Sequence, residues 1–174
     1  MEDRQSYSDL TMALAYLSLG SNLDDREAQL RQALSQLAAV AQVITVSSFY
    51  ETEPVEFTQQ PWFINCAVAV TTSLTPQQVM ASLLDIEQEM GRQRTQKKGP
   101  RSIDIDLLLF NDLVIGSNEL TIPHPAMQQR RFVLEPLAEI APDAVHPVLK
   151  RTIRELLDAL PPGQKVRKLP ASGN

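Results

Sequence analysis

Residues 97–110 read KKGPRSIDIDLLLF, and in the apolar second half of this stretch Asp104 and Asp106 lie two positions apart. The β-branched and leucine content after the turn signal Gly99-Pro100 predicts a strand. Because alternate residues of a strand face the same way, the two carboxylates should lie side by side. The alternation divides the other residues between the faces, with Ile103, Ile105, Leu107 and Leu109 opposite the aspartates and Leu108 and Phe110 on the aspartate face.

Two carboxylates in a half-buried place repel each other and lose hydration, so we expect a cation between Asp104 and Asp106. Magnesium is the natural candidate, because it accepts a few carboxylate oxygens, keeps water and takes other ligands from substrate phosphates. The spacing alone leaves an alternative open, namely a solvated strand face or a pair of ordinary salt bridges.

Basic groups flank the aspartates in an otherwise acidic chain. The 16 lysines and arginines against 21 acidic residues give a formal net charge of −5, which argues against broad nucleic-acid binding and for a local anion site. Carboxylates and arginines together are typical of phosphoryl-transfer enzymes, and no glycine-rich P-loop motif occurs. The basic groups are Arg92, Arg94, Lys97, Lys98 and Arg101 before the pair and His124, Arg130 and Arg131 after it.

Length and composition predict one compact domain. The chain has 174 residues, of which 43% are hydrophobic, and we expect a single domain over 12–160 between flexible tails at 1–11 and 161–174. The apolar runs are too short for a membrane span and the start lacks signal-peptide character, so a cytoplasmic protein is expected. The single cysteine, Cys66, reads as a small core residue rather than a nucleophile.

The periodicity predicts the order β-α-β-β-α-β, followed by short strands and helices. This is the split βαβ, or ferredoxin-like, arrangement of the α+β class, with an antiparallel sheet and both helices on one face. Thr75-Pro76 supplies the start of the second helix and Gly91 its end. The predicted strands are 13–19, 43–50, 62–71 and 102–110, with short ones at 113–115 and 120–122, and the predicted helices are 24–40, 75–90, 129–138 and 150–160.

Several motifs in one order carry a resemblance over residues 13–160. Gly99-Pro100-Arg101 followed by the aspartate pair resembles the signature of the 6-hydroxymethyl-7,8-dihydropterin pyrophosphokinase family of folate biosynthesis. The other matching motifs are Leu19-Gly20-Ser21-Asn22, Ser47-Ser48-Phe49-Tyr50, Phe63-Ile64-Asn65, Ile86-Glu87, Ile122-Pro123-His124, and Arg130 with Phe132.

The resemblance implies an ATP-dependent diphosphokinase that transfers the pyrophosphoryl group of MgATP to the hydroxymethyl oxygen of the pterin and releases AMP. Asp104 and Asp106 would hold two Mg²⁺ ions. The implied partners are ATP and the pterin, with no nucleic acid, no membrane and a monomeric chain. The implied catalytic and nucleotide-side residues are Arg92, Arg94, Arg101, Glu87, Leu107, Thr121, His124 and Arg130, and the implied pterin-side residues are Thr52, Glu53, Val55, Phe63, Asn65 and Phe132.

Each implied residue also has an ordinary structural reading. Asn65 could be a satisfied buried amide, Phe63 and Phe132 core residues, His124 a loop cap, and Arg130 with its neighbour Arg131 a solvated charge pair. The chain also departs from the family pattern at three positions. Lys98 replaces an aromatic residue before Gly-Pro-Arg, Leu84 a glutamine on the second helix, and Pro125 an aromatic residue after His124.

Two other classes of function share these features. A nucleotidyl transferase with an Asp-x-Asp strand would release pyrophosphate instead of AMP. A non-enzymatic ligand-binding module of the same fold would tolerate loss of either aspartate.

Overall fold

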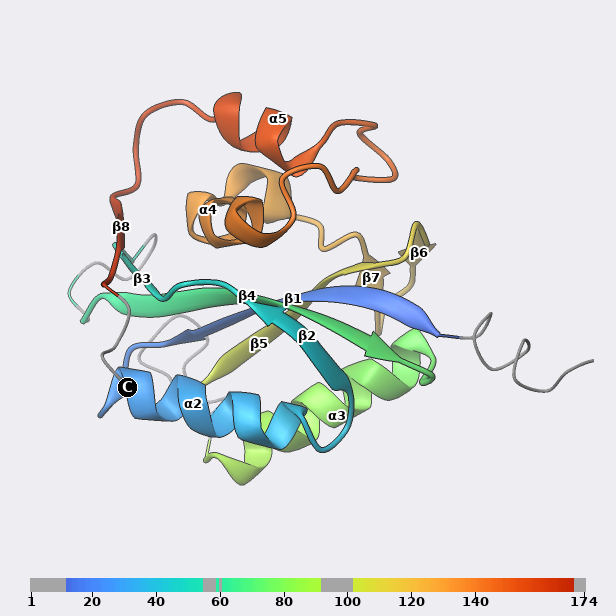
Figure 1. The fold of residues 1–174 in the computed structure, drawn as a ribbon, viewed down its shortest axis with the longest axis horizontal. Coiled ribbons are helices and arrows are strands. Elements are labelled where there is room, and N and C mark those ends of the chain that lie inside the picture. Colours follow the sequence, from blue (N-terminus) through green and yellow to red (C-terminus); the bar gives the residue numbers. More distant parts are fainter. Residues whose placement is uncertain (1–11, 55–58, 60, 92–101, 171–174) are drawn as a thin grey trace, which may run out of the picture.

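The computed structural model describes residues 12–54, 59, 61–91 and 102–170, and Figure 1 shows a sheet between two layers of helices. The helices α2 and α3 cover one face, called the α2 face here, and α4 covers the other, called the α4 face, with α5 packed on the side of α4 away from the sheet. In chain order the elements are β1 (Ala13–Ser21), α2 (Arg26–Leu37), β2 (Gln42–Val46), β3 (Tyr50–Thr52), β4 (Phe63–Thr72), α3 (Pro76–Glu89), β5 (Asp104–Phe110), β6 (Ile115–Gly116), β7 (Thr121–Ile122), the 3₁₀ turn η1 (Met127–Gln129), α4 (Arg131–Ile140), α5 (Ile153–Asp158) and β8 (Val166–Lys168).

The main sheet has six strands in the order β5-β1-β4-β3-β8, with β2 also paired to β4. All of these pairings are antiparallel, so the predicted α+β class with an antiparallel sheet is confirmed. The predicted strand at 43–50 is divided into β2 and β3. Between them the Ser47 hydroxyl accepts a hydrogen bond from the Ala67 backbone N–H at 2.8 Å, so a side chain replaces one rung of the ladder.

Local sequence signals fix the two helices of the α2 face. Asp25 caps α2 by accepting from the Ala28 N–H at 3.1 Å. Thr75 and Gln78 form a reciprocal capping box at the start of α3, with Pro76 in the first turn. Gly91, with φ of +81°, follows the end of α3, as the sequence predicts. Among the described residues, none of the helices has both the length and the apolar composition needed to cross a lipid bilayer.

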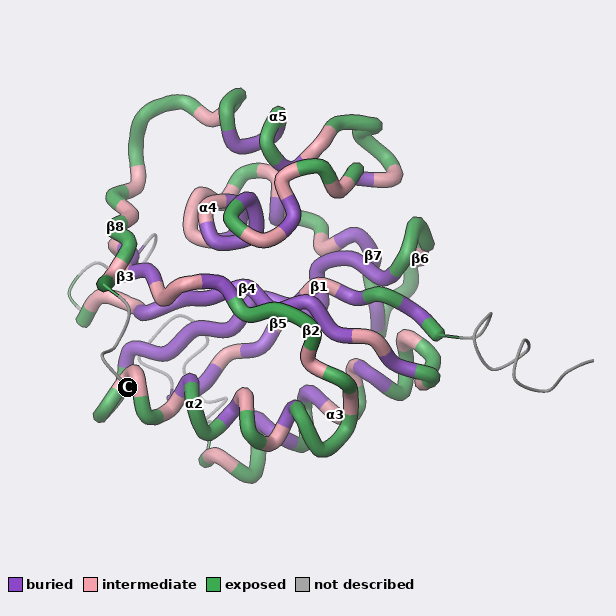
Figure 2. The backbone as a smooth tube through the Cα atoms, in the orientation of Figure 1, coloured by how far each residue is buried: buried purple, intermediate pink, exposed green. Residues whose placement is uncertain are grey.

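Apolar side chains form a core on each side of the sheet, and Figure 2 shows the buried backbone concentrated along the central strands. The larger cluster lies between the sheet and α2 and α3. It includes Cys66, whose side chain is fully buried as predicted, and burial raises the pKa of this thiol to about 12. The second cluster joins Ala67, Leu108 and Leu109 to α4 and α5.

The alternation predicted for β5 holds only as far as Leu108. The β1–β5 register shifts after Leu17, so that Leu17 opposes Leu107 while Tyr16 opposes Leu109. Leu108 is therefore an extra residue, and the two residues after it change faces. Leu109 packs on the α4 face and Phe110 on the α2 face, the reverse of the prediction.

The C-terminal region also differs from the predicted tail at 161–174. Val166–Lys168 forms β8, which pairs with β3 at the edge of the sheet. Backbone bonds extend this attachment on both sides, from Glu53 N–H to the Lys165 carbonyl at 3.0 Å and from Leu169 N–H to the Phe49 carbonyl at 2.8 Å. The polar and proline-rich composition concealed an ordinary edge strand.

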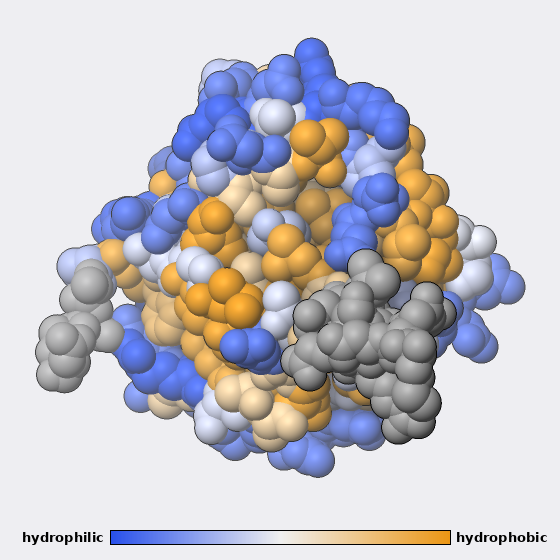
Figure 3. Space-filling model, turned by 45° about the vertical axis from the view of Figure 1, so that its right-hand side comes forward, coloured by the Kyte–Doolittle hydropathy of each residue, from blue (hydrophilic) through white to orange (hydrophobic). Residues whose placement is uncertain are grey.

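Apolar side chains also reach the surface. Figure 3 shows a face on which hydrophobic residues gather in the middle and hydrophilic residues surround them. The short edge strand β2 contributes to the exposed apolar residues, since the exposed fractions of Ile44 and Val46 are 51% and 36%. Neither helical layer covers these two side chains of β2.

Glu139 of α4 attaches this helix to the sheet. Its carboxylate accepts hydrogen bonds from the Tyr50 hydroxyl at 2.6 Å and from the Ser48 N–H and hydroxyl, both at 3.0 Å. The Lys168 ammonium lies 3.9 Å away. Burial raises the pKa of this carboxyl, but the bonds from Tyr50 and Ser48 outweigh burial and hold the pKa below its usual value.

Glu139→Gln should lower the free energy of unfolding by about 1–2 kcal/mol at pH 7, because charged acceptors make stronger hydrogen bonds. The fold favours the carboxylate, so this contribution is present above the usual glutamate pKa of about 4.3 and is lost as the pH falls through the lowered pKa of the folded state. Denaturant unfolding at several pH values should therefore show the gap between wild type and variant narrowing below about pH 4. Glu135→Gln, on the same helix but paired only with Arg131 at 3.6 Å among the described contacts, is the matched control.

Candidate active site

The strand register lines up polar residues across the α4 face of the sheet. Asp104 of β5 opposes Gly20 of β1, Gly20 opposes Asn65 of β4, and Asn65 opposes Tyr50 of β3. Directly opposed residues of a sheet project from the same face, so these four form one row. Asp106 lies in the next row, opposite Ser18. The rows lie where β1 ends and where β4 and β5 begin.

Asp104 and Asp106 are half-buried and share this face, as the sequence predicts. Helix α3 holds the backbone between them, because its Glu87 carboxylate accepts a hydrogen bond from the Ile105 N–H at 2.8 Å. Glu87 is buried, with an exposed fraction of 3%. Its described contact thus fixes the strand that carries both aspartates, which is a structural role beside the nucleotide-side role implied by the resemblance.

His124 lies beside the aspartates, and Arg130 is close enough to His124 to affect its pKa. The His124 Nε2 is 4.0 Å from the Asp106 Oδ1, and its Nδ1 accepts the Ala126 N–H at 3.3 Å. Burial and the Arg130 guanidinium lower the pKa of His124, while Asp104 opposes this shift. The backbone N–H of His124 donates to the Leu108 carbonyl at 3.0 Å, which attaches the histidine loop to β5. The lowered pKa favours the neutral imidazole, whose Nε2 faces the Asp106 carboxylate.

Asn65 is buried, with an exposed fraction of 4%, and its amide nitrogen donates to the Thr52 hydroxyl at 2.5 Å. Its Oδ1 lies over Gly20, close enough that a Cβ on Gly20 would collide with it. The ring of Phe63 is also near, since its Cδ1 would be 3.6 Å from that Cβ. The missing side chain of Gly20 therefore makes room for the Asn65 amide on the α4 face of the sheet.

Phe132 is half-exposed in the first turn of α4, and the Arg130 guanidinium lies 5.6 Å from the centroid of its ring. Such a separation is a cation–π contact. The Phe132 N–H donates to the Gln164 Oε1 at 3.2 Å. Glu53, another residue implied by the resemblance, is tied to the same segment, because its carboxylate accepts the Lys165 N–H at 3.2 Å.

Other predicted site residues lie apart from these rows or cannot be compared with them. The Leu107 side chain belongs to the core of the α2 face, so only its main chain is available on the aspartate side. Thr121 is exposed on β7, and its described bond, at 3.5 Å, goes to the Ser117 carbonyl of its own hairpin. Arg92, Arg94, Arg101 and Val55 lie outside the described residues, and their roles stay predictions.

Two residues of this region were assigned no individual role from the sequence. Gly20 belongs to the matching motif Leu19-Gly20-Ser21-Asn22 but was given no role of its own, although a glycine in a strand can mark close approach by another group. Gln164 lies in a segment read as a tail, and no local pattern connects it with Glu53 or Phe132.

Comparisons with known proteins agree with these features. A family model described as 7,8-dihydro-6-hydroxymethylpterin-pyrophosphokinase (HPPK) matches residues 16–142. The 2-amino-4-hydroxy-6-hydroxymethyldihydropteridine pyrophosphokinase of Bacillus subtilis is 51% identical over 130 residues, which cover 73% of this chain and 77% of the relative. The protein of that name from Methylorubrum extorquens is 44% identical over 153 residues, or 87% of this chain and 96% of the relative.

Longer relatives match as well. The folic acid synthesis protein fol1 of Schizosaccharomyces pombe is 43% identical over 92% of this chain, which spans only 22% of that protein. The chain likewise spans 24% of the folic acid synthesis protein of Dictyostelium discoideum.

The solved structures support the fold. The wild-type HPPK-DHPS of Plasmodium falciparum with pteroate superposes with a TM-score of 0.69 at 18% identity, over 84% of this chain and 44% of that chain. With the family model matching most of the chain and close relatives matched over most of their length, the chain belongs to the 7,8-dihydro-6-hydroxymethylpterin-pyrophosphokinase family.

Proposed function

We propose that this chain transfers the pyrophosphoryl group of ATP to the hydroxymethyl oxygen of 6-hydroxymethyl-7,8-dihydropterin, with release of AMP, as a step of folate biosynthesis. The observation that carries the proposal is the row Asp104–Gly20–Asn65 on one face of the sheet. It puts an acidic group two strand spacings, about 10 Å, from a buried amide. A flat bicyclic ring beside the Asn65 amide can bond to it with one edge and direct a substituent toward Asp104.

The two aspartates fit a magnesium site of the substrate-dependent kind. Within the described part of the chain, no group of three or more His, Cys, Asp or Glu side chains comes together around a metal position. Magnesium is often bound by one or two carboxylates, with water and substrate phosphates completing its ligands, and the pair suits this pattern. Asp104 and Asp106 would hold the ions, which when bound would neutralise phosphate charge and acidify the attacking hydroxyl.

The protein's own groups account for binding and orientation. Thr52 fixes the Asn65 amide, so that its Oδ1 can accept from the pterin edge without losing a rotamer on binding. Phe63 and Phe132 are the candidates to contact the ring faces. Arg130, which is close enough to His124 to lower its pKa, can pair with phosphate oxygens, and the same role is proposed for Arg92, Arg94 and Arg101.

A product assay tests the function directly. The protein is incubated with MgATP and 6-hydroxymethyl-7,8-dihydropterin, and the nucleotide products are identified. AMP formed in equal amount with pterin pyrophosphate supports the proposal. Release of inorganic pyrophosphate would instead indicate a nucleotidyl transferase, and absence of turnover would favour a non-enzymatic binding module.

Replacing either aspartate should abolish turnover. Asp104→Asn and Asp106→Asn each remove one metal-binding charge while relieving the repulsion between neighbouring carboxylates, so kcat should fall at least about 1,000-fold with the melting temperature held or raised. Steady-state kinetics and thermal unfolding measure the two effects. Asp112→Asn, in the exposed turn after β5, is the control and should retain wild-type kinetics. Near-native kcat in either site variant would rule out the metal site.

Gly20→Ala should impair the pterin side selectively. The new Cβ collides with the Asn65 Oδ1, so the amide must move and the floor of the pocket rises. We expect the KM for the pterin to increase by about tenfold or more and the dissociation constant of MgATP to change less than about twofold. The matched control is Gly116→Ala, where a Cβ would meet nothing within 4 Å. Equal weakening of pterin and MgATP binding would show that Gly20 only supports the fold.

A further inference from the structure

The C-terminal strap, defined as residues 164–169, carries a side chain that connects two parts of the candidate pterin pocket. The Gln164 Oε1 accepts the Phe132 N–H at 3.2 Å, and its Nε2 donates to the Glu53 carbonyl. Glu53 directly follows Thr52, which holds Asn65. One partly buried amide thus joins the start of α4 to the end of β3.

The bond to Phe132 satisfies a need of α4. The first N–H groups of a helix have no partner within the helix, and a side chain at the N-cap position usually supplies one. The N-cap residue of α4 is Arg130, which makes no side-chain capping bond. Gln164 supplies the missing acceptor from a distant part of the chain, at the helical residue whose ring contacts Arg130.

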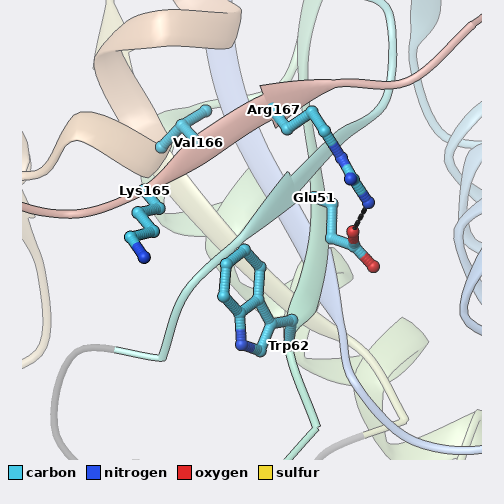
Figure 4. Close-up of a pocket in the computed structure, with 5 residues that line it drawn as sticks. All are labelled: Glu51, Trp62, Lys165, Val166 and Arg167. Atoms are coloured by element: carbon cyan, nitrogen blue, oxygen red, sulfur yellow. Dashed lines mark hydrogen bonds and ion pairs between the residues drawn. The ribbon is translucent and has the colours of Figure 1, made fainter.

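The rest of the strap is attached independently of Gln164. On the opposite face of β8, Arg167 pairs with Glu51, and Glu51 also pairs with Arg26 of α2 at 3.0 Å. Figure 4 shows this side, where Lys165 and Trp62 line a pocket of about 450 Å³. Backbone pairing with β3 adds to the attachment. The strap therefore forms a fixed base from which Gln164 can hold Phe132 and Glu53.

We propose that Gln164 is a positioning residue for pterin binding, acting through the Phe132 N–H and the Glu53 carbonyl. The proposal rests on the proposed function, because it takes Phe132 and the Thr52–Glu53 segment as walls of the pterin pocket. Without the amide, the first turn of α4 and the end of β3 lose their common partner. The pterin must then order both walls when it binds, whereas the aspartate side is unaffected.

The experiment compares wild type with Gln164→Ala, Gln164→Glu and the control Lys165→Ala. Loss of two hydrogen bonds predicts an increase of about three- to tenfold in the KM for the pterin for Gln164→Ala, with the KM for ATP and kcat within about twofold. Gln164→Glu keeps an acceptor for the Phe132 N–H, and a negative charge is favoured near a helix N-terminus. It loses the donor to the Glu53 carbonyl, so its KM for the pterin should lie between those of wild type and Gln164→Ala. Lys165→Ala should match wild type.

The outcomes separate the proposal from the function on which it rests. If wild type shows no transfer to the pterin, the proposed function fails. If wild type is active and Gln164→Ala keeps the wild-type KM for the pterin, the positioning role is overturned. The same holds if Gln164→Ala raises the KM for the pterin and the KM for ATP by equal factors. Gln164→Glu behaving like Gln164→Ala would overturn the link through Phe132, and Gln164→Glu also decides the matter if Gln164→Ala does not fold.

Discussion

The antiparallel pairing of β1 with both β4 and β5 is the interaction on which the candidate site depends. It brings the aspartates, a residue without a side chain and a buried amide into two adjacent rows, although these residues are separated by dozens of positions in the chain. A slip of one residue in either pairing would turn the aspartates or Asn65 into the core. The buried leucines and valines on the α2 face prevent such a slip, since each would have to be exposed or displaced.

The two faces of the sheet divide the work between them. The α2 face supplies most of the apolar packing, and through Glu87 it also holds the backbone of β5 from behind. On the α4 face, the end of the sheet that carries the aspartates is only half-buried, and 30% of the Asp106 side chain is exposed. His124 and Arg130 bring cationic or neutral donors to that end, with the neutral form of His124 favoured by burial and by its neighbour. Packing and chemistry are therefore placed on opposite sides of the same strands.

Periodicity and capping signals predicted the succession of strands and helices along the chain and the two helices of the α2 face, because Thr75, Pro76 and the apolar stripes act locally. The bulge at Leu108 was not predictable, since it arises from the shifted pairing with Tyr16 and Leu17 and has no mark of its own in an all-leucine run. The strand β8 was missed because its pairing partner lies more than a hundred positions away, and the division between β2 and β3 depends on a Ser47 bond to another strand. For the site, sequence spacing predicted the shared face of Asp104 and Asp106, whereas the proximity of Gly20 to Asn65 required the register.

The burial of Cys66 gives the molecule a built-in chemical reporter. Its sulfur is the only thiol of the chain, lies in the core of the α2 face and stays protonated at neutral pH. Alkylating reagents attack the thiolate, so modification of the native protein has to wait for an opening that exposes the central strand β4. The rate of labelling under native conditions then measures how often the sheet opens, without any introduced probe.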